Sequence, residues 1–242
     1  MEHQWKEEDY IAFRTDLISN QDEKYRIFHE KLLRSSLPVI GIRIPILRKE
    51  AKEVAKVAGK DFFLVCEKDT YEERLLYGLV ATLVPMEFDE FLFHCDKYAN
   101  EYVENWAHCD VFCGSLKKIV AKNEVAFFEH TKAYLKSDNP WVVRVGVIIF
   151  LSHYLKDPYL EEVLRLVDEV HSDFYYIEMG QAWLLATAWA KNPEMVRNYL
   201  DVATISYAVK AKFVQKACES FRVSDQDKAW LRKWKELQKQ SR

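Results

Sequence analysis

An aromatic residue returns every 35 residues through the middle of the chain, at Tyr71, Trp106, Trp141 and Tyr176. Each of the four opens an apolar stretch with the residue spacing of a helix. A fixed period of this kind is typical of stacked helical repeats, which bury their apolar faces on their neighbours. The period therefore predicts a chain built of helices rather than sheets.

Short breaks separate the helical stretches. Each break is only a few residues long, which suits antiparallel helices that follow one another directly. The breaks fall at Pro85, Asn100, Asn123, residues 138–140, residues 157–158, Ser172 and residues 192–193. We therefore predict an all-α fold, a right-handed α-α superhelix of HEAT-like (ARM-type) helical repeats.

A single domain over residues 1–242 accommodates the whole pattern. Residues 1–60 hold a first helix pair and a loop that feeds a helix starting near Pro45 and ending near Gly59. Repeats of the 35-residue period fill residues 61–222. Residues 223–242 form an amphipathic helix, with Trp230 and Trp234 one turn apart, which we expect to cap the array.

The composition argues against several classes of site. With six glycines and no GxGxxG or GxxxxGK motif, the chain predicts no nucleotide cofactor, and we expect no cofactor of any kind. The five cysteines lack a CxxC frame and no HxxxH occurs, so we expect neither a metal site nor a disulfide. No apolar run approaches the roughly 20 residues that span a bilayer, and the charged N-terminus lacks a signal-peptide core. We expect a cytoplasmic monomer with no membrane association.

Two polar residues interrupt the apolar pattern once the repeats are aligned on their aromatics. Asp110 follows Trp106 by four residues, and Arg144 follows Trp141 by three residues one repeat later. Residues three and four apart share a helix face. Trp183 follows in the next repeat. A carboxylate can stabilise a developing cation, a guanidinium matches phosphate, and indole rings can pack on a sugar or a base.

Purely structural roles for these residues stay open. Asp110 could be a helix N-cap or an ion-pair partner, and Arg144 could pair with it inside the array. Tryptophans at helical spacing are often core residues, and for Trp141 we favour that role. The net charge of -3 does not by itself predict a nucleic-acid binder, so a local basic patch would have to supply the contacts.

Several short motifs make the chain resemble bacterial alkylpurine DNA glycosylases of the AlkD type, which are built from HEAT-like repeats. The motifs are GIRIPILRKEAK at residues 41–52, NWxxxD at 105–110, WxxR at 141–144 and IxxxxxW at 177–183. Each motif is short, but their order, spacing and common repeat period match the family. The similarity runs from about residue 21 to about residue 222.

The resemblance implies a concave surface that holds duplex DNA by its backbone and excises cationic purines alkylated at N3 or N7, without a deep base pocket. By motif, Asp110 would stabilise the sugar oxocarbenium and position the attacking water, and Trp106 and Trp183 would pack on the deoxyribose. Arg144 would hold the neighbouring phosphate. Further backbone contacts are expected from Arg43, Arg48, Lys49, Lys117 and Lys118.

Four positions depart from the family pattern. Leu32 stands where we expect an aromatic residue, and Glu178, Met179 and Ala186 stand where relatives resemble one another in carrying basic or amide side chains. Fewer phosphate contacts would weaken DNA binding by orders of magnitude at physiological salt. The resemblance thus favours a DNA glycosylase, a hydrolase of N-glycosyl bonds. The departures keep open a non-catalytic HEAT-like module that binds DNA weakly or docks a protein partner on its concave face.

Overall fold

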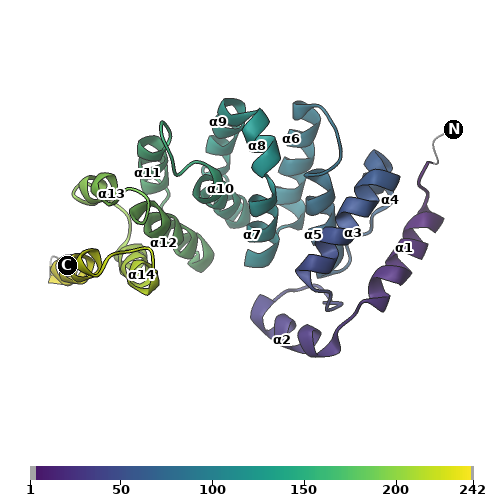
Figure 1. The fold of residues 1–242 in the computed structure, drawn as a ribbon, viewed down its shortest axis with the longest axis horizontal. Coiled ribbons are helices and arrows are strands. Elements are labelled where there is room, and N and C mark those ends of the chain that lie inside the picture. Colours follow the sequence, from purple (N-terminus) through teal and green to yellow (C-terminus); the bar gives the residue numbers. More distant parts are fainter. Residues whose placement is uncertain (1–3, 241–242) are drawn as a thin grey trace. The chain divides into compact units, whose positions relative to one another are not determined.

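The computed structural model describes residues 4–240, and within that range it contains helices and turns but no strand. The all-α prediction is confirmed. The chain divides into two compact units, one up to Ile119 and the other from Val120, and we describe each by itself (Figure 1).

The first unit contains the N-terminal helices and the helices that begin at Tyr71 and Trp106. Its helices are α1 (Glu7–Ser19), α2 (Glu23–Leu33), α3 (Ile44–Val57), a 3-10 turn at Gly59–Asp61, α4 (Phe62–Val65), α5 (Tyr71–Ala81), α6 (Phe88–Lys97), a π-helical turn at Tyr98–Tyr102, α7 (Trp106–Ser115) and the start of α8 (Lys117–Lys122).

The second unit takes the chain to its last helix. After the end of α8 it contains α9 (Glu124–Tyr134), α10 (Pro140–His153), α11 (Leu160–Asp168), α12 (Tyr175–Trp189), α13 (Pro193–Leu200), α14 (Tyr207–Glu219) and α15 (Asp225–Gln240).

The repeated aromatics mark the helix starts as predicted. Tyr71 and Trp106 are the first residues of α5 and α7, while Trp141 and Tyr176 are the second residues of α10 and α12. The Trp141 ring lies 5.0 Å from that of Tyr176, centroid to centroid, so this pair joins one repeat to the next. This contact accords with the structural role favoured for Trp141, which stays a prediction.

Polar caps and prolines explain why the helices begin where they do. The side chains of Thr70, Asn105, Asn192 and Ser206 accept hydrogen bonds from backbone N–H groups in the first turns of α5, α7, α13 and α14. Proline stands in the first turn of α3, α10 and α13, where its missing N–H costs nothing. The predicted break at Asn100 is wrong, because the π-helical turn continues to Tyr102 and the chain leaves the helix only at residues 103–105.

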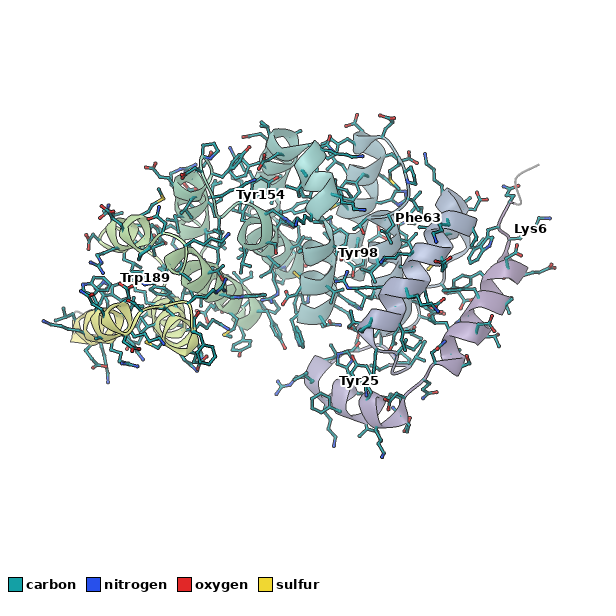
Figure 2. The ribbon with its side chains drawn as sticks, viewed as in Figure 1. Lys6, Tyr25, Phe63, Tyr98, Tyr154 and Trp189 are labelled. Atoms are coloured by element: carbon teal, nitrogen blue, oxygen red, sulfur yellow. The ribbon has the colours of Figure 1, made fainter. Side chains whose placement is uncertain are left out.

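Each unit has its own packed core, with side chains interleaved between neighbouring helices (Figure 2). In the first unit α5 packs on α3 and α7, around a cluster that includes Tyr10, Leu47 and Leu75. In the second unit α12 packs on α10 and α14. The predicted C-terminal helix is confirmed as α15, whose Trp230 stacks between Trp189 and Trp234. None of the helices within residues 4–240 is long and apolar enough to cross a membrane.

Candidate functional site

Helix α7 carries two of the predicted site residues on one face. Trp106 opens the helix and Asp110 lies one turn later, both half-buried. The N-cap is Asn105, whose Oδ1 accepts from the backbone N–H groups of Ala107 and His108, each at 3.0 Å. The N-cap interpretation of Asp110 is therefore wrong, since Asp110 lies in the second turn.

A buried histidine fixes the start of α7 on α5. The His108 ring stacks on Tyr71 with centroids 4.7 Å apart and 14° between the planes. Its Nε2 lies 2.9 Å from the Tyr71 carbonyl oxygen, which can only accept, so Nε2 carries the proton. Nδ1 then accepts from the Asn105 amide at 3.3 Å. Burial lowers the pKa of His108 to about 4, so the ring is neutral at pH 7.

The residue before this cap ties α7 to the segment after α2. Glu104 accepts hydrogen bonds from the hydroxyls of Ser35 and Ser36. Burial alone would raise the pKa of Glu104, but these two hydrogen bonds and nearby positive charge, that of Arg74 included, together lower it. Leu32, at the position where an aromatic was expected, lies three residues before Ser35 and is 49% exposed.

The first turn of α5 holds the loop that leads into α3. The Glu72 side chain, 0% exposed, accepts from the backbone N–H groups of Ile40, Gly41 and Ile42 at 2.7 to 3.1 Å. Gly41 has a φ of 94°, which favours glycine. Burial raises the pKa of Glu72 even though the three N–H donors oppose that shift.

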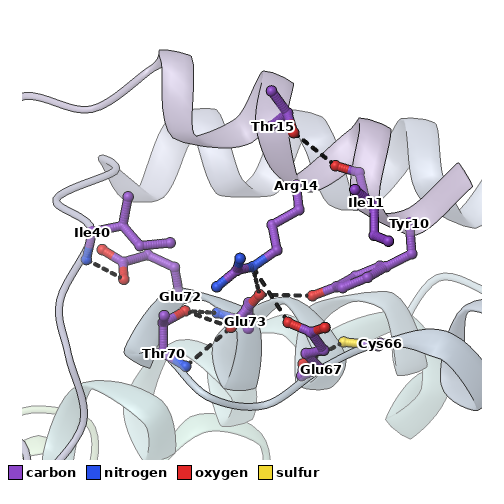
Figure 3. A network of polar contacts seen from close by, with 10 residues as sticks. All are labelled: Tyr10, Ile11, Arg14, Thr15, Ile40, Cys66, Glu67, Thr70, Glu72 and Glu73. Atoms are coloured by element: carbon purple, nitrogen blue, oxygen red, sulfur yellow. Dashed lines mark hydrogen bonds and ion pairs between the residues drawn. The ribbon is translucent and has the colours of Figure 1, made fainter. Parts of the chain in front are cut away.

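The adjacent carboxylate anchors α1 (Figure 3). Glu73 accepts from the Tyr10 hydroxyl at 2.8 Å and from Arg14 Nε at 2.6 Å, and it closes a capping box with Thr70. Burial would raise the pKa of Glu73, but the bonds from Arg14, Tyr10 and Thr70 outweigh it and the pKa is lowered. Adjacent carboxylates thus position α1 and the entry to α3 from a single turn.

Three of the predicted DNA-binding cations are brought to one end of α7. Arg48 on α3 donates from Nη1 to the Ser115 hydroxyl at 2.9 Å, at the last residue of α7. Lys117 and Lys118 follow directly and are exposed.

The other two predicted DNA-binding cations of the first unit, Arg43 and Lys49, lie at the start of α3 and within it. Arg43 pairs with Asp22 at 2.7 Å and lies over the Tyr25 ring at 4.8 Å. The Lys49 side chain is 77% exposed, with its ammonium 3.6 Å from a Glu50 oxygen.

Arg144 and Trp183 belong to the second unit. Arg144 is 4% exposed and donates to the Tyr176 carbonyl oxygen. Gly180 lies against it, because a Cβ built there would be 3.5 Å from Arg144 Nη1. Trp183 on α12 is 38% exposed.

Three of the residues that depart from the family pattern, Glu178, Met179 and Ala186, lie in α12. Glu178 accepts from the Ser206 hydroxyl at 3.1 Å. Met179 is half-buried and Ala186 is buried.

Sequence reasoning missed the residues that position this site. No anchoring role was predicted for Glu72, Glu73, Glu104 or His108, although the Thr70-x-x-Glu73 pattern before an apolar run is a recognisable capping box. The others gave no local signal, because their partners lie 30 or more residues away in the chain.

A family model described as DNA alkylation repair enzyme matches residues 13–233. The chain belongs to the DNA alkylation repair enzyme family. That membership gives the protein a role in the repair of alkylated DNA, with DNA as its substrate. The match includes every candidate residue named above. None of the curated proteins matches the chain. The suspected family is therefore confirmed, and the roles of individual residues stay predictions.

Proposed function

We propose that the protein is a DNA glycosylase that hydrolyses the N-glycosidic bond of cationic N3- or N7-alkylpurines in duplex DNA. The observation that carries the proposal is the placement of Asp110 one turn beyond Trp106, on a helix whose start is fixed by Asn105 and His108. A group that acts on a transition state must be held in one orientation, and this polar anchoring supplies that rigidity.

The chemistry needs little more than a carboxylate and a water molecule. An alkylated purine already carries a positive charge, so it leaves as a neutral base when the bond to C1′ breaks and takes the bonding electrons. The sugar becomes an oxocarbenium ion, which the Asp110 carboxylate stabilises. Water then adds to C1′ and loses a proton to Asp110 or to solvent. The indole of Trp106 packs on the deoxyribose and keeps bulk water away.

Cations near the end of α7 are proposed to hold the DNA backbone. Arg48, Lys117 and Lys118 converge there, and neither lysine makes an ion pair within residues 4–240. Each phosphate neutralised adds affinity through the release of counterions. Arg43 and Lys49 extend the same role along α3, and we assign Arg144 to a phosphate and Trp183 to the deoxyribose by motif. The reaction as written uses no cofactor.

The test is the release of free base from a duplex containing N7-methylguanine. We expect Asp110→Asn to bind the duplex as the wild type does and to release base about 100-fold more slowly, because it lacks the charge that stabilises the cation. Asp173→Asn, an exposed position on the second unit, is the matched control and should match the wild type.

Two results would count against the proposal. If the wild-type protein releases no base at concentrations where it binds the duplex, it is not a glycosylase for this lesion. If Asp110→Asn releases base as fast as the wild type, the enzyme remains but Asp110 has no part in its chemistry.

The alternative is a non-catalytic HEAT-like module that binds DNA weakly or docks a protein partner on its concave face. Leu32, Met179 and Ala186 favour it, because none of them can contact a phosphate through charge, and Glu178 is engaged with Ser206. Binding without base release supports this alternative. The packing of helices on their neighbours along the chain favours a HEAT-like repeat. The right-handed superhelix, the single domain, the monomer and the cytoplasmic location stay predictions.

A further inference from the structure

Helices α11 and α13 of the second unit pack on each other (Figure 1). Side chains of both helices line a groove. Its volume is about 980 Å³, at the upper end for ligand sites in proteins. Apolar side chains form much of its lining, among them Leu164, Met195 and Val202. Val202 is 75% exposed, so the groove presents apolar surface that the described part of the chain does not cover.

The rim of the groove is negatively charged. Glu161 and Glu194, one on each helix, are exposed and make no hydrogen bond or ion pair within residues 4–240. The one cation among the lining residues of that range, Arg165, is bound to Glu169. The groove therefore repels phosphate, and duplex DNA is not its ligand.

One wall of the groove is held rigid. Asp168, at the end of α11, accepts from the Tyr199 hydroxyl at 2.7 Å and from the Thr204 N–H and hydroxyl at 2.9 and 2.7 Å. It also accepts from the Ile205 N–H at 3.3 Å. Burial would raise the pKa of Asp168, but these bonds outweigh it and the pKa is lowered, so the carboxylate stays ionised at neutral pH. A wall fixed in advance reduces the ordering cost of binding.

We propose that the α11–α13 groove docks a basic, amphipathic segment of a partner protein. Lysine or arginine side chains of the segment pair with Glu161 and Glu194, and an apolar side chain between them packs on Leu164, Met195 and Val202. A small polyamine would leave the apolar floor unused, and charge complementarity excludes an acidic partner. The inference uses none of the residues proposed for chemistry and is independent of the glycosylase proposal.

The test uses a labelled peptide of about 12 residues in which lysine and leucine alternate at helical spacing, measured by fluorescence anisotropy. The Glu161→Lys, Glu194→Lys double variant should bind it about tenfold more weakly than the wild type. The Asp173→Lys, Glu236→Lys variant is the control, because it changes the net charge equally at exposed positions outside the groove and should bind as the wild type does. Circular dichroism and thermal unfolding confirm that both variants are folded.

Three outcomes would overturn the inference. Equal loss in both double variants would show attraction to net charge alone. Equally tight binding of a peptide with serine in place of leucine would show that the apolar floor plays no part. A wild-type dimer in light scattering that becomes monomeric in the Glu161→Lys, Glu194→Lys variant would show that a second copy of the chain occupies the groove.

Discussion

The two helices that carry the predicted sugar-facing tryptophans are held in place by different forces. The start of α7 is fixed by Asn105, whose side chain accepts from the His108 backbone N–H, and by the His108 ring, which donates to the Tyr71 carbonyl oxygen. Helix α12 relies on apolar packing against α10 and α14, with one buried amide, Gln181, donating to the carbonyl oxygens of Val167 and Val170 at 3.0 and 2.8 Å. The anchor of α7 can titrate, whereas the Gln181 amide cannot.

The difference shows where orientation matters most. A buried hydrogen-bond network specifies one arrangement, because losing one partner leaves the other unsatisfied in a medium that cannot solvate it. Apolar packing tolerates exchange for side chains of similar volume. The helix with the candidate carboxylate thus has the stricter anchor, and substitutions should affect the two helices unequally.

Replacing the cap of α7 should have the largest effect. Asn105→Ala removes the acceptor of two N–H groups and the donor to His108, and Asn105 is 2% exposed, so water cannot take its place. We expect a loss of about 3 kcal/mol in the free energy of unfolding, measured in urea. Asn192→Ala, at the half-buried cap of α13, is the control and should lose about 1 kcal/mol. Equal losses would mean that the His108 bond contributes nothing.

Acid should destabilise the protein through His108. Its pKa is about 4 in the folded state and about 6.5 when unfolded, so the unfolded chain binds the proton first. The contribution of neutral His108 to the free energy of unfolding is fully present above pH 6.5 and is lost as the pH falls toward 4. The loss is about 2 kcal/mol between pH 7 and pH 5. Burial also lowers the pKa of His29 and His94, so these residues add to the acid response. The part due to His108 is therefore measured by comparing the wild type with a variant that lacks this histidine.

The comparison variant is His108→Phe, which keeps a ring against Tyr71 but cannot titrate. The variant should lose about 2 kcal/mol less than the wild type between pH 7 and pH 5. Hydrogen exchange localises the change, since amide protection should fall in α7 before α12. Parallel curves for the two proteins would remove His108 as the source of the pH response.

The helix starts could be predicted from the sequence because the residues that set them are local. Tyr71 and Trp106 stand at helix starts, and Pro45 and Pro140 lie in first turns, where each residue type has a short-range reason to be. The anchors Glu72, Glu104 and His108, whose partners lie far away in the chain, could not be predicted. Glu72 reads as a charged surface residue, and only the fold brings the N–H groups of residues 40–42 to it.

The candidate site shows the same division. Trp106 and Asp110 could be placed on one face from their spacing alone, which the structure confirms. His108 lies between them in the chain, but its partner is the Tyr71 carbonyl of another helix, and backbone acceptors leave no mark in a sequence.

The buried amide of α12 should be less sensitive to substitution than the cap of α7. Gln181→Met keeps a similar volume in the core but leaves the carbonyl oxygens of Val167 and Val170 without the amide donor. We expect a loss of about 1.5 kcal/mol in the free energy of unfolding, independent of pH between 7 and 5. Thermal unfolding at both pH values checks both parts. A loss as large as that of Asn105→Ala would mean that α12 is anchored as strictly as α7.

The smallest effects come from the glycine in each helix. A Cβ at Gly114 of α7 would meet nothing within 4 Å, so Gly114→Ala should stabilise the protein by about 0.5 kcal/mol through helix propensity. At Gly180 of α12 a Cβ would lie 3.3 Å from Val147 Cγ1, on a fully buried side chain. That contact should cancel the gain, leaving Gly180→Ala within about 0.3 kcal/mol of the wild type in urea unfolding. If both variants gain equally in the free energy of unfolding, α12 packs on α10 loosely enough to accept an added methyl group. Apolar contact alone would then not fix the orientation of Trp183.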